Sequence, residues 1–176
     1  MARALPSSIK AYTAFVDGHG MAGRTTGGKL PVIKAKIEEY RDGGMDGSED
    51  LEFGIEKMEA ELTFSELDRT VLTAVLSRNL PITLRGSMEG ENGTKVAVVA
   101  NFRGLVTEVD PGEWGDPKKS EVKLKLTPGY YRLTIGGREI YEIDLRGGVR
   151  RIDGVGQLAL RRAALCLEGA TDMSRH

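Results

Sequence analysis

The sequence predicts a mainly β protein with some helix, an antiparallel β-barrel or sandwich that forms a single domain over residues 1–176. Its 23 glycines exceed the roughly 7% of average usage and lie between apolar segments, which indicates many turns and many short strands. Apolar and polar residues alternate in several of these segments, as in half-buried strands. Strand and helix patterns do not alternate along the chain, so the parallel sheet of an α/β fold is not expected.

Eight segments carry strand patterns. They are residues 11–18, 30–40, 51–64, 81–88, 95–110, 121–128, 130–135 and 138–144. The segment 30–40 also has a helical pattern, since Ile33 and Ile37 would share one face of a helix, but its alternation favours a strand. Asn92 and Gly93 form a strong hairpin signal between two of the predicted strands.

One flanking helix is predicted near residues 65–77. Its apolar residues recur at helical spacing and are Leu67, Val71, Leu72, Val75 and Leu76. Ser65 can cap the first turn, with Asp68 three residues later in an approximate capping box. A short C-terminal helix is predicted within residues 155–167, and residues 168–176 are expected to form a flexible tail.

Charge is distributed unevenly along a chain whose formal net charge is only -1. Residues 1–37 hold six basic residues and one acidic residue, whereas residues 38–61 hold ten acidic and two basic residues. The C-terminal residues 146–176 are again basic. Opposite charges on different surfaces of one subunit favour head-to-tail contacts between copies, which close into rings or propagate as filaments. The charge pattern therefore predicts self-assembly.

The counts of cysteine and histidine exclude several kinds of site. Cys166 is the single cysteine, so neither an internal disulfide nor a cysteine-rich metal site is expected. His19 and His176 are the two histidines, which argues against a histidine triad or a histidine metal cluster. Carboxylates are many, but nothing selects a catalytic pair among them. We therefore expect no enzyme, no cofactor and no metal.

Targeting signals are not evident in the sequence. Residues 1–15 have no apolar stretch long enough for a secretory signal, and the longest apolar run, 96–100, is too short to span a bilayer. We therefore expect a soluble protein that is made in the cytoplasm.

A glycine-rich stretch at 18–30 imitates two nucleotide-binding motifs. Its glycines have the spacing of a dinucleotide fingerprint, and Gly28 and Lys29 supply most of the end of a P-loop. A nucleotide site also needs a helix whose N-terminus meets the phosphates, and no apolar helical pattern starts here. Leu30 occupies the P-loop position that requires a Ser or Thr hydroxyl. We interpret the stretch as turns and loops.

Five segments, in order along the chain, resemble one known family. They are residues 38–47, 54–64, 103–114, 130–144 and 148–158. Together they are similar to the major tail tube protein of contractile-tailed bacteriophages and of the related phage-tail-like bacteriocins, the tailocins. The similarity runs from about Phe15 to Leu167, which is most of the chain.

The resemblance implies a structural protein. Subunits of this family are β-barrel-like or sandwich-like, with a flanking helix; they form hexameric rings that stack into a rigid tube inside a contractile sheath. The implied partners are the sheath, baseplate and tape-measure proteins, with DNA passing through the lumen of a phage tube. In a bacteriocin the tube perforates the target envelope. The expected location is a virion tail or a tailocin particle, synthesised and assembled in the bacterial host cytoplasm.

By the same resemblance, the loop at 41–56 would contact the adjacent ring. The charge pattern adds the hypothesis that acidic residues of this loop meet basic residues near the termini. The candidate contact residues are Asp42, Asp46, Glu49, Asp50, Glu52, Arg150 and Arg151. DNA must slide without sticking, and a wall rich in Lys and Arg would bind its phosphates. The lumen is therefore expected to have an acidic or neutral potential.

Two alternatives stay open from the sequence. The first is the tube protein of a type VI secretion system, which is built on a similar ring-forming barrel. The second is a monomeric β-barrel that binds a small ligand, which predicts an apolar pocket and no assembly at any concentration. The sequence also leaves open whether a tube would serve a phage or a bacteriocin.

Overall fold

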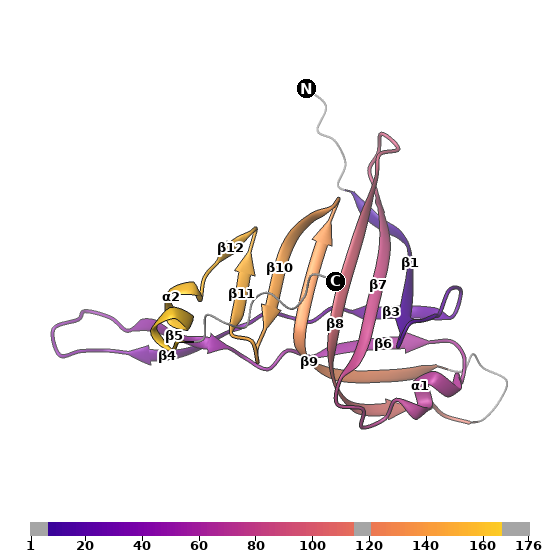
Figure 1. The fold of residues 1–176 in the computed structure, drawn as a ribbon, viewed down its shortest axis with the longest axis horizontal. Helices are drawn as coiled ribbons and strands as arrows, with labels where there is room; N and C mark the ends of the chain where they lie inside the picture. Colours follow the sequence, from indigo (N-terminus) through magenta and orange to yellow (C-terminus); the bar gives the residue numbers. More distant parts are fainter. Residues whose placement is uncertain (1–6, 115–120, 167–176) are drawn as a thin grey trace.

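The computed structural model describes residues 7–114 and 121–166, which form a mainly β subunit with two short helices (Figure 1). In chain order the elements are β1 Ser8–Val16, β2 His19–Gly20, β3 Thr25–Lys29, β4 Ala35–Tyr40, β5 Glu49–Ile55, β6 Ala60–Phe64, α1 Arg69–Thr73, β7 Leu80–Glu89, β8 Lys95–Asp110, β9 Val122–Ile135, β10 Arg138–Asp144, β11 Val149–Ile152, β12 Val155–Gly156 and α2 Ala159–Ala164. The mainly β, antiparallel class predicted from the sequence is confirmed. The predicted tail at 168–176 lies outside the described residues.

The main sheet is antiparallel and has the strand order β12-β11-β10-β9-β8-β7-β1-β2. A second, smaller layer is attached through β9, whose first half also pairs with β6, while β6 pairs with β3. In Figure 1, β8 and β9 bend below the main sheet and continue beside β6. The two long strands therefore belong to both layers of the sandwich.

The bend depends on Gly104 of β8. A Cβ atom at this position would lie 2.1 Å from the carbonyl oxygen of Thr127, closer than a side chain can approach. Gly104 pairs with Pro128, and the register of the ladder shifts beside it. Because proline cannot donate a ladder hydrogen bond, it is tolerated at such an irregular position. The segments 121–128 and 130–135, expected to be separate strands, are one continuous strand β9.

The core lies between the two layers and takes alternate residues from the long strands. Phe102 of β8 and Tyr131 of β9 meet edge to face, with ring centroids 6.4 Å apart. Burial raises the pKa of Tyr131 to about 12, because a buried phenolate would lose its hydration. The largest fully buried side chains are Tyr131, Phe64, Phe102, Met21, Met58, Leu62, Ile82, Leu124, Leu126, Ile143, Val16 and Val71.

The flanking helix is present but shorter than the predicted 65–77. Its N-cap is Asp68, not Ser65, and the Asp68 carboxylate accepts a hydrogen bond of 2.7 Å from the Thr70 backbone N–H. Burial alone would raise the pKa of Asp68, but hydrogen bonds from Thr70 and Val71 and the charge of Arg24 outweigh it, so the pKa is lowered. The helix stops at Thr73.

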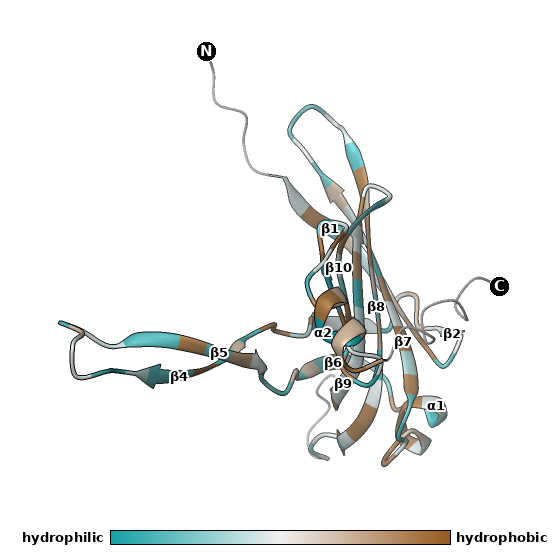
Figure 2. Cartoon of the chain, turned by 60° about the vertical axis from the view of Figure 1, so that its left-hand side comes forward, coloured by the Kyte–Doolittle hydropathy of each residue, from teal (hydrophilic) through white to brown (hydrophobic). Residues whose placement is uncertain are grey.

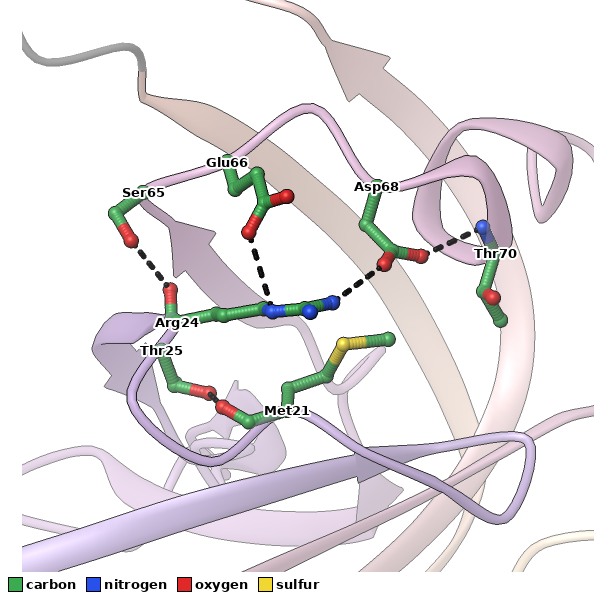
Figure 3. Close-up of polar contacts among 7 residues, drawn as sticks. All are labelled: Met21, Arg24, Thr25, Ser65, Glu66, Asp68 and Thr70. Carbon is green, nitrogen blue, oxygen red and sulfur yellow. Dashed lines mark hydrogen bonds and ion pairs between the residues drawn. The ribbon is translucent and has the colours of Figure 1, made fainter.

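Arg24 explains why Ser65 is not the cap (Figure 3). The Ser65 hydroxyl and backbone N–H both donate to the Arg24 carbonyl oxygen, at 3.2 and 2.8 Å. The Arg24 guanidinium in turn lies 3.1 Å from the Glu66 carboxylate and 3.0 Å from that of Asp68. Ser65 is thus held against the loop before β3, and the helix begins three residues later than expected.

The glycine-rich stretch at 18–30 forms turns and strands. His19–Gly20 pairs with β1, and Thr25–Lys29 pairs with β6. The residues that follow it reach β4 without forming a helix. The local structure that phosphate binding needs at this place is therefore missing, in agreement with the sequence interpretation.

Candidate assembly interface

A two-stranded arm, residues 35–55, projects from the sandwich. It consists of β4, β5 and their connecting loop, and β4 and β5 form a sheet of their own (Figures 1 and 2). The predicted strands 30–40 and 51–64 therefore differ from the observed strands. The first begins only at Ala35, and the second is divided between β5 in the arm and β6 in the second layer.

The arm is strongly acidic and its charges are poorly balanced. It contains seven acidic and two basic residues. Glu39 and Asp50 stand directly opposite each other in the ladder, and like charges in this position destabilise a sheet. In the described part of the chain, no ion pair involves Asp42, Asp46, Glu49 or Asp50. The arm therefore presents carboxylates that a cationic partner would stabilise.

One face of the arm is also apolar. Tyr40, Leu51 and Phe53 are 50%, 44% and 56% exposed, and we call these three residues the apolar arm face. Leu51 is paired with Glu38 and Tyr40 with Glu49, so acidic residues flank the apolar ones on the same face. An isolated two-stranded hairpin is only marginally stable in water, so this arm needs a contact that covers it.

The base of the arm carries two ion pairs. Arg150 of β11 contacts Glu52 and so ties the arm to the sandwich, whereas Lys34 lies 3.0 Å from Glu56 and joins the two chain segments on either side of the arm. The structure thus brings together two of the candidate contact residues, Glu52 and Arg150, within one chain. Arg151, also a candidate, contacts Glu142 and lies 3.4 Å from Glu139, both on β10.

The solvent-facing side of the main sheet carries a row of polar residues in register. Thr83, Asn101, Arg132, Glu142 and Arg151 follow one another across five strands. The Thr83 hydroxyl donates to the Asn101 side-chain oxygen at 2.9 Å, and Arg132 lies 3.0 Å from Glu139. The arginines of this row are therefore held by carboxylates of the same chain. We call this surface the polar sheet face.

The second layer exposes a comparable ladder of alternating charge. Lys29, Glu61, Lys125 and Glu108 stand in register across β3, β6, β9 and β8. Lys125 lies 3.2 Å from Glu108, and the hydrogen bond and charge of Glu108 raise the pKa of Lys125. The depression at this place is lined mainly by lysines, glutamates and threonines, unlike the apolar pocket that a ligand-binding barrel predicts.

Two kinds of feature are absent from the described residues: clusters of metal-ligating side chains and helices that could span a membrane. Within 7–114 and 121–166, no group of three or more His, Cys, Asp or Glu side chains is placed to hold a metal ion. No helix in the same ranges is long and apolar enough to cross a bilayer.

The sandwich pairs many of its charges within the chain, whereas the acidic arm leaves several carboxylates without an ion-pair partner among the described residues. This combination is typical of a structural subunit that assembles with other chains. The sequence model described as "Phage tail tube protein FII" matches residues 6–166. The chain belongs to this family of phage tail tube proteins. It is a structural subunit of a tail tube and not an enzyme, as expected from the sequence.

Two characterised relatives support this assignment along nearly the whole chain. The tail tube protein of Escherichia phage P2 is 29% identical over 166 residues, covering 90% of this chain and 96% of the relative. The major tail tube protein of Serratia phage KSP20 is 28% identical over 156 residues, covering 86% of this chain and 90% of the relative.

Solved structures share the fold at much lower identity. The sheath/tube terminator of the PVC extracellular contractile injection system has a TM-score of 0.57 and 12% identity, covering 74% of this chain and 97% of that chain. The cap that terminates the tube of the anti-feeding prophage has a TM-score of 0.55 and 17% identity, covering 77% of this chain and 93% of that chain. These matches extend the fold to contractile injection systems.

Proposed function

We propose that this subunit forms hexameric rings that stack into a hollow tube inside a contractile sheath. The tube would conduct DNA from a phage head or perforate the target envelope as part of a bacteriocin. Family membership supports the tube, and the fold match to a chain of a PVC sheath-tube complex in its extended state, with a TM-score of 0.56, supports the sheath as a partner. Baseplate and tape-measure proteins complete the proposed set of partners, with assembly in the bacterial host cytoplasm.

The arm is the observation that carries this proposal. It projects away from the sandwich, and much of its charge and apolar surface has no partner in its own chain (Figure 2). A surface that differs from the surface it binds gives head-to-tail contacts, which close into rings or continue as stacks. The arm is therefore suited to join one ring to the next, with Asp42, Asp46, Glu49, Asp50 and Glu52 at the contact and Arg150 and Arg151 among the basic residues beside it.

Sheet edges supply the second element of a ring. The main sheet ends at β12 and β2, and such edges expose backbone N–H and C=O groups that another copy can pair with. Pairing of subunits edge to edge would extend the main sheet around the ring. The inner barrel of the tube would then be continuous.

The polar sheet face is the proposed wall of the lumen. Arg132 and Arg151 are held by carboxylates, and the Arg103 guanidinium lies 4.3 Å from the centre of the Tyr130 ring. Arginines that are already paired offer phosphates fewer counter-charges, so DNA would bind the wall weakly. A wall of this kind would have the neutral or acidic potential expected from the sequence.

Negative-stain electron microscopy of the purified chain at rising concentration tests the proposal. Hollow rings or tubes of uniform width are expected. If only monomers form, baseplate or tube seeds from the source organism are added, because a tube can require nucleation. Monomers that persist with such seeds would contradict the proposed function and favour a monomeric barrel.

A further inference from the structure

A second apolar surface lies beside the base of the arm. The short helix α2 and the turn between β10 and β11 form a groove of about 220 Å³, which we call the α2 groove. It is lined by Gly54, Ile55, Ile143, Asp144, Leu145, Gly148, Val149, Arg150, Leu158, Arg161, Arg162 and Leu165. Apolar side chains thus make up much of its lining, and three arginines lie among them.

The helix α2 is only weakly held by its own chain. None of its residues is buried, and its N-terminus has no side-chain cap. Leu165, which lines the groove, is 62% exposed, and Leu160, which does not, is 88% exposed. A helix in this state has an unpartnered apolar surface.

Two of the three arginines of the α2 groove are available to a partner. In the described part of the chain, no ion pair involves Arg161 or Arg162. Arg150 is already held by Glu52 of its own chain. Arg161 and Arg162 are therefore the arginines of the groove that an incoming carboxylate can meet.

We propose that the α2 groove of one copy receives the apolar arm face of another copy. Leu51 and Phe53 pack against Leu158 and Leu165, and carboxylates of the arm approach Arg161 and Arg162. The inference rests on the proposed function, because it names the partner surface of the arm within the tube.

The two surfaces complement each other in both polarity and charge. The arm offers apolar side chains among seven acidic residues, and α2 offers apolar side chains beside two arginines without an ion-pair partner among the described residues. Glu38 is paired with Leu51 and Glu49 with Tyr40, so these two carboxylates share the apolar arm face and are placed to meet the guanidinium groups.

The arm of the same chain cannot make this contact. Its base, through Gly54 and Ile55, forms one wall of the groove. The rest of the arm runs outward from this base, away from α2 (Figure 2). We therefore take the occupant to be the arm of a second copy.

Cross-linking through the native cysteine tests the contact directly. Cys166 is exposed and adjoins Leu165, and it is the single cysteine of the chain. A Leu51→Cys variant, assembled into tubes and treated with a short bismaleimide, is expected to give a ladder of linked subunits on a denaturing gel. A ladder that stops at six subunits would place the contact within a ring, and a longer ladder would place it between rings.

Two matched controls sharpen the reading. A Val75→Cys variant keeps Cys166 and adds a cysteine of similar exposure, 48%, just after α1, and it should give no ladder. The double variant Leu51→Cys, Cys166→Ser should give none either. Tubes of the Leu51→Cys variant that show no ladder would overturn the inference and leave the tube function intact. If no chain assembles, wild type included, both proposals are contradicted.

Charge exchange supplies an independent test. Glu38→Lys with Glu49→Lys should reduce tube yield at least tenfold, and Arg161→Asp with Arg162→Asp should do the same. Combining all four changes should restore most of the yield. Failure of the combination to restore it, with each variant still folded by circular dichroism, would count against the pairing. A Leu165→Glu variant that forms normal tubes but no longer binds sheath would assign the α2 groove to the sheath instead.

Discussion

The sandwich and the arm differ in how far their apolar side chains are buried and their charges are paired within the chain. In the sandwich, alternate residues are buried in one core, and exposed charges such as those of Lys125 and Glu108 are paired within the chain. In the arm, all six residues of β4 are exposed and several carboxylates have no ion-pair partner among the described residues. We therefore expect the sandwich to determine the stability of the subunit and the arm to determine how subunits meet. Changes in the two regions should separate into folding effects and assembly effects.

The largest effect on folding is expected at the bend of the long strands. Gly104→Ala places a methyl group 2.1 Å from the Thr127 carbonyl oxygen, so the two layers can no longer join as they do. We expect a loss of more than about 3 kcal/mol in the free energy of unfolding. Gly129→Ala is the matched control, since no heavy atom lies within 4 Å of its added Cβ. Urea unfolding measures both, and similar midpoints for the two variants would contradict the role of Gly104.

A pair of phenylalanines compares the two regions directly. Phe102 is 1% exposed in the core and Phe53 is 56% exposed on the arm. Phe102→Ala should cost about 3–5 kcal/mol of subunit stability. Phe53→Ala should change that stability by less than about 0.5 kcal/mol and yet lower the yield of tubes. Chemical unfolding measures the first effect and sedimentation of tubes the second. Equal unfolding midpoints for the two variants would contradict the expected difference between the core and the arm.

The helix cap should give a smaller effect that depends on pH. Asp68→Ala removes the acceptor for Thr70 and should cost about 1 kcal/mol, whereas Asp68→Asn keeps a capping oxygen. The folded pKa of Asp68 lies below its ordinary value of 3.8, so its ionised form stabilises the fold above that pH. This contribution is lost as the pH falls through the folded pKa. Wild type should thus lose more stability than Asp68→Asn on acidification below about pH 4, and parallel curves would count against the cap.

The smallest effect is expected from the paired charges of the second layer. Lys125→Gln removes one exposed ion pair with Glu108, and exposed pairs contribute little to stability. Neither the unfolding midpoint nor the yield of tubes should change measurably. The contrast is with the exposed Glu38 and Glu49 of the arm, whose reversal should impair assembly alone. Loss of tubes in Lys125→Gln would show that charges of the body also hold subunits together.

The sequence predicted the sandwich better than the arm, for a physical reason. Alternation identifies a strand when one of its faces is buried, as in β7 and β8, whose predicted bounds were close to those observed. In the arm neither face is buried, so the alternating pattern of residues 51–64 did not reveal that residues 56–59 separate β5 from β6. The apolar face formed by Tyr40, Leu51 and Phe53 was not expected for the same reason.

Side-chain contacts far apart in sequence account for most of the other differences. Arg24 holds Ser65 and moves the helix cap to Asp68, and no pattern within residues 65–77 could reveal this. Similarly, Arg150 and Arg151 were identified as basic contact residues from charge alone. The partners that each finds in its own chain depend on strand register. For the α2 groove, the sequence held one signal of a contact surface: two adjacent arginines, Arg161 and Arg162, that lie between leucines.

Removing the arm tests the division between folding and assembly most directly. Ala35 and Ile55 are paired in the ladder, so residues 36–54 can be replaced by Asn-Gly to close a short hairpin. Electron microscopy should show tubes for wild type and only unassembled subunits for the shortened chain at the same concentration, with both chains unfolding cooperatively. Tubes of normal length and yield from the shortened chain would contradict the account.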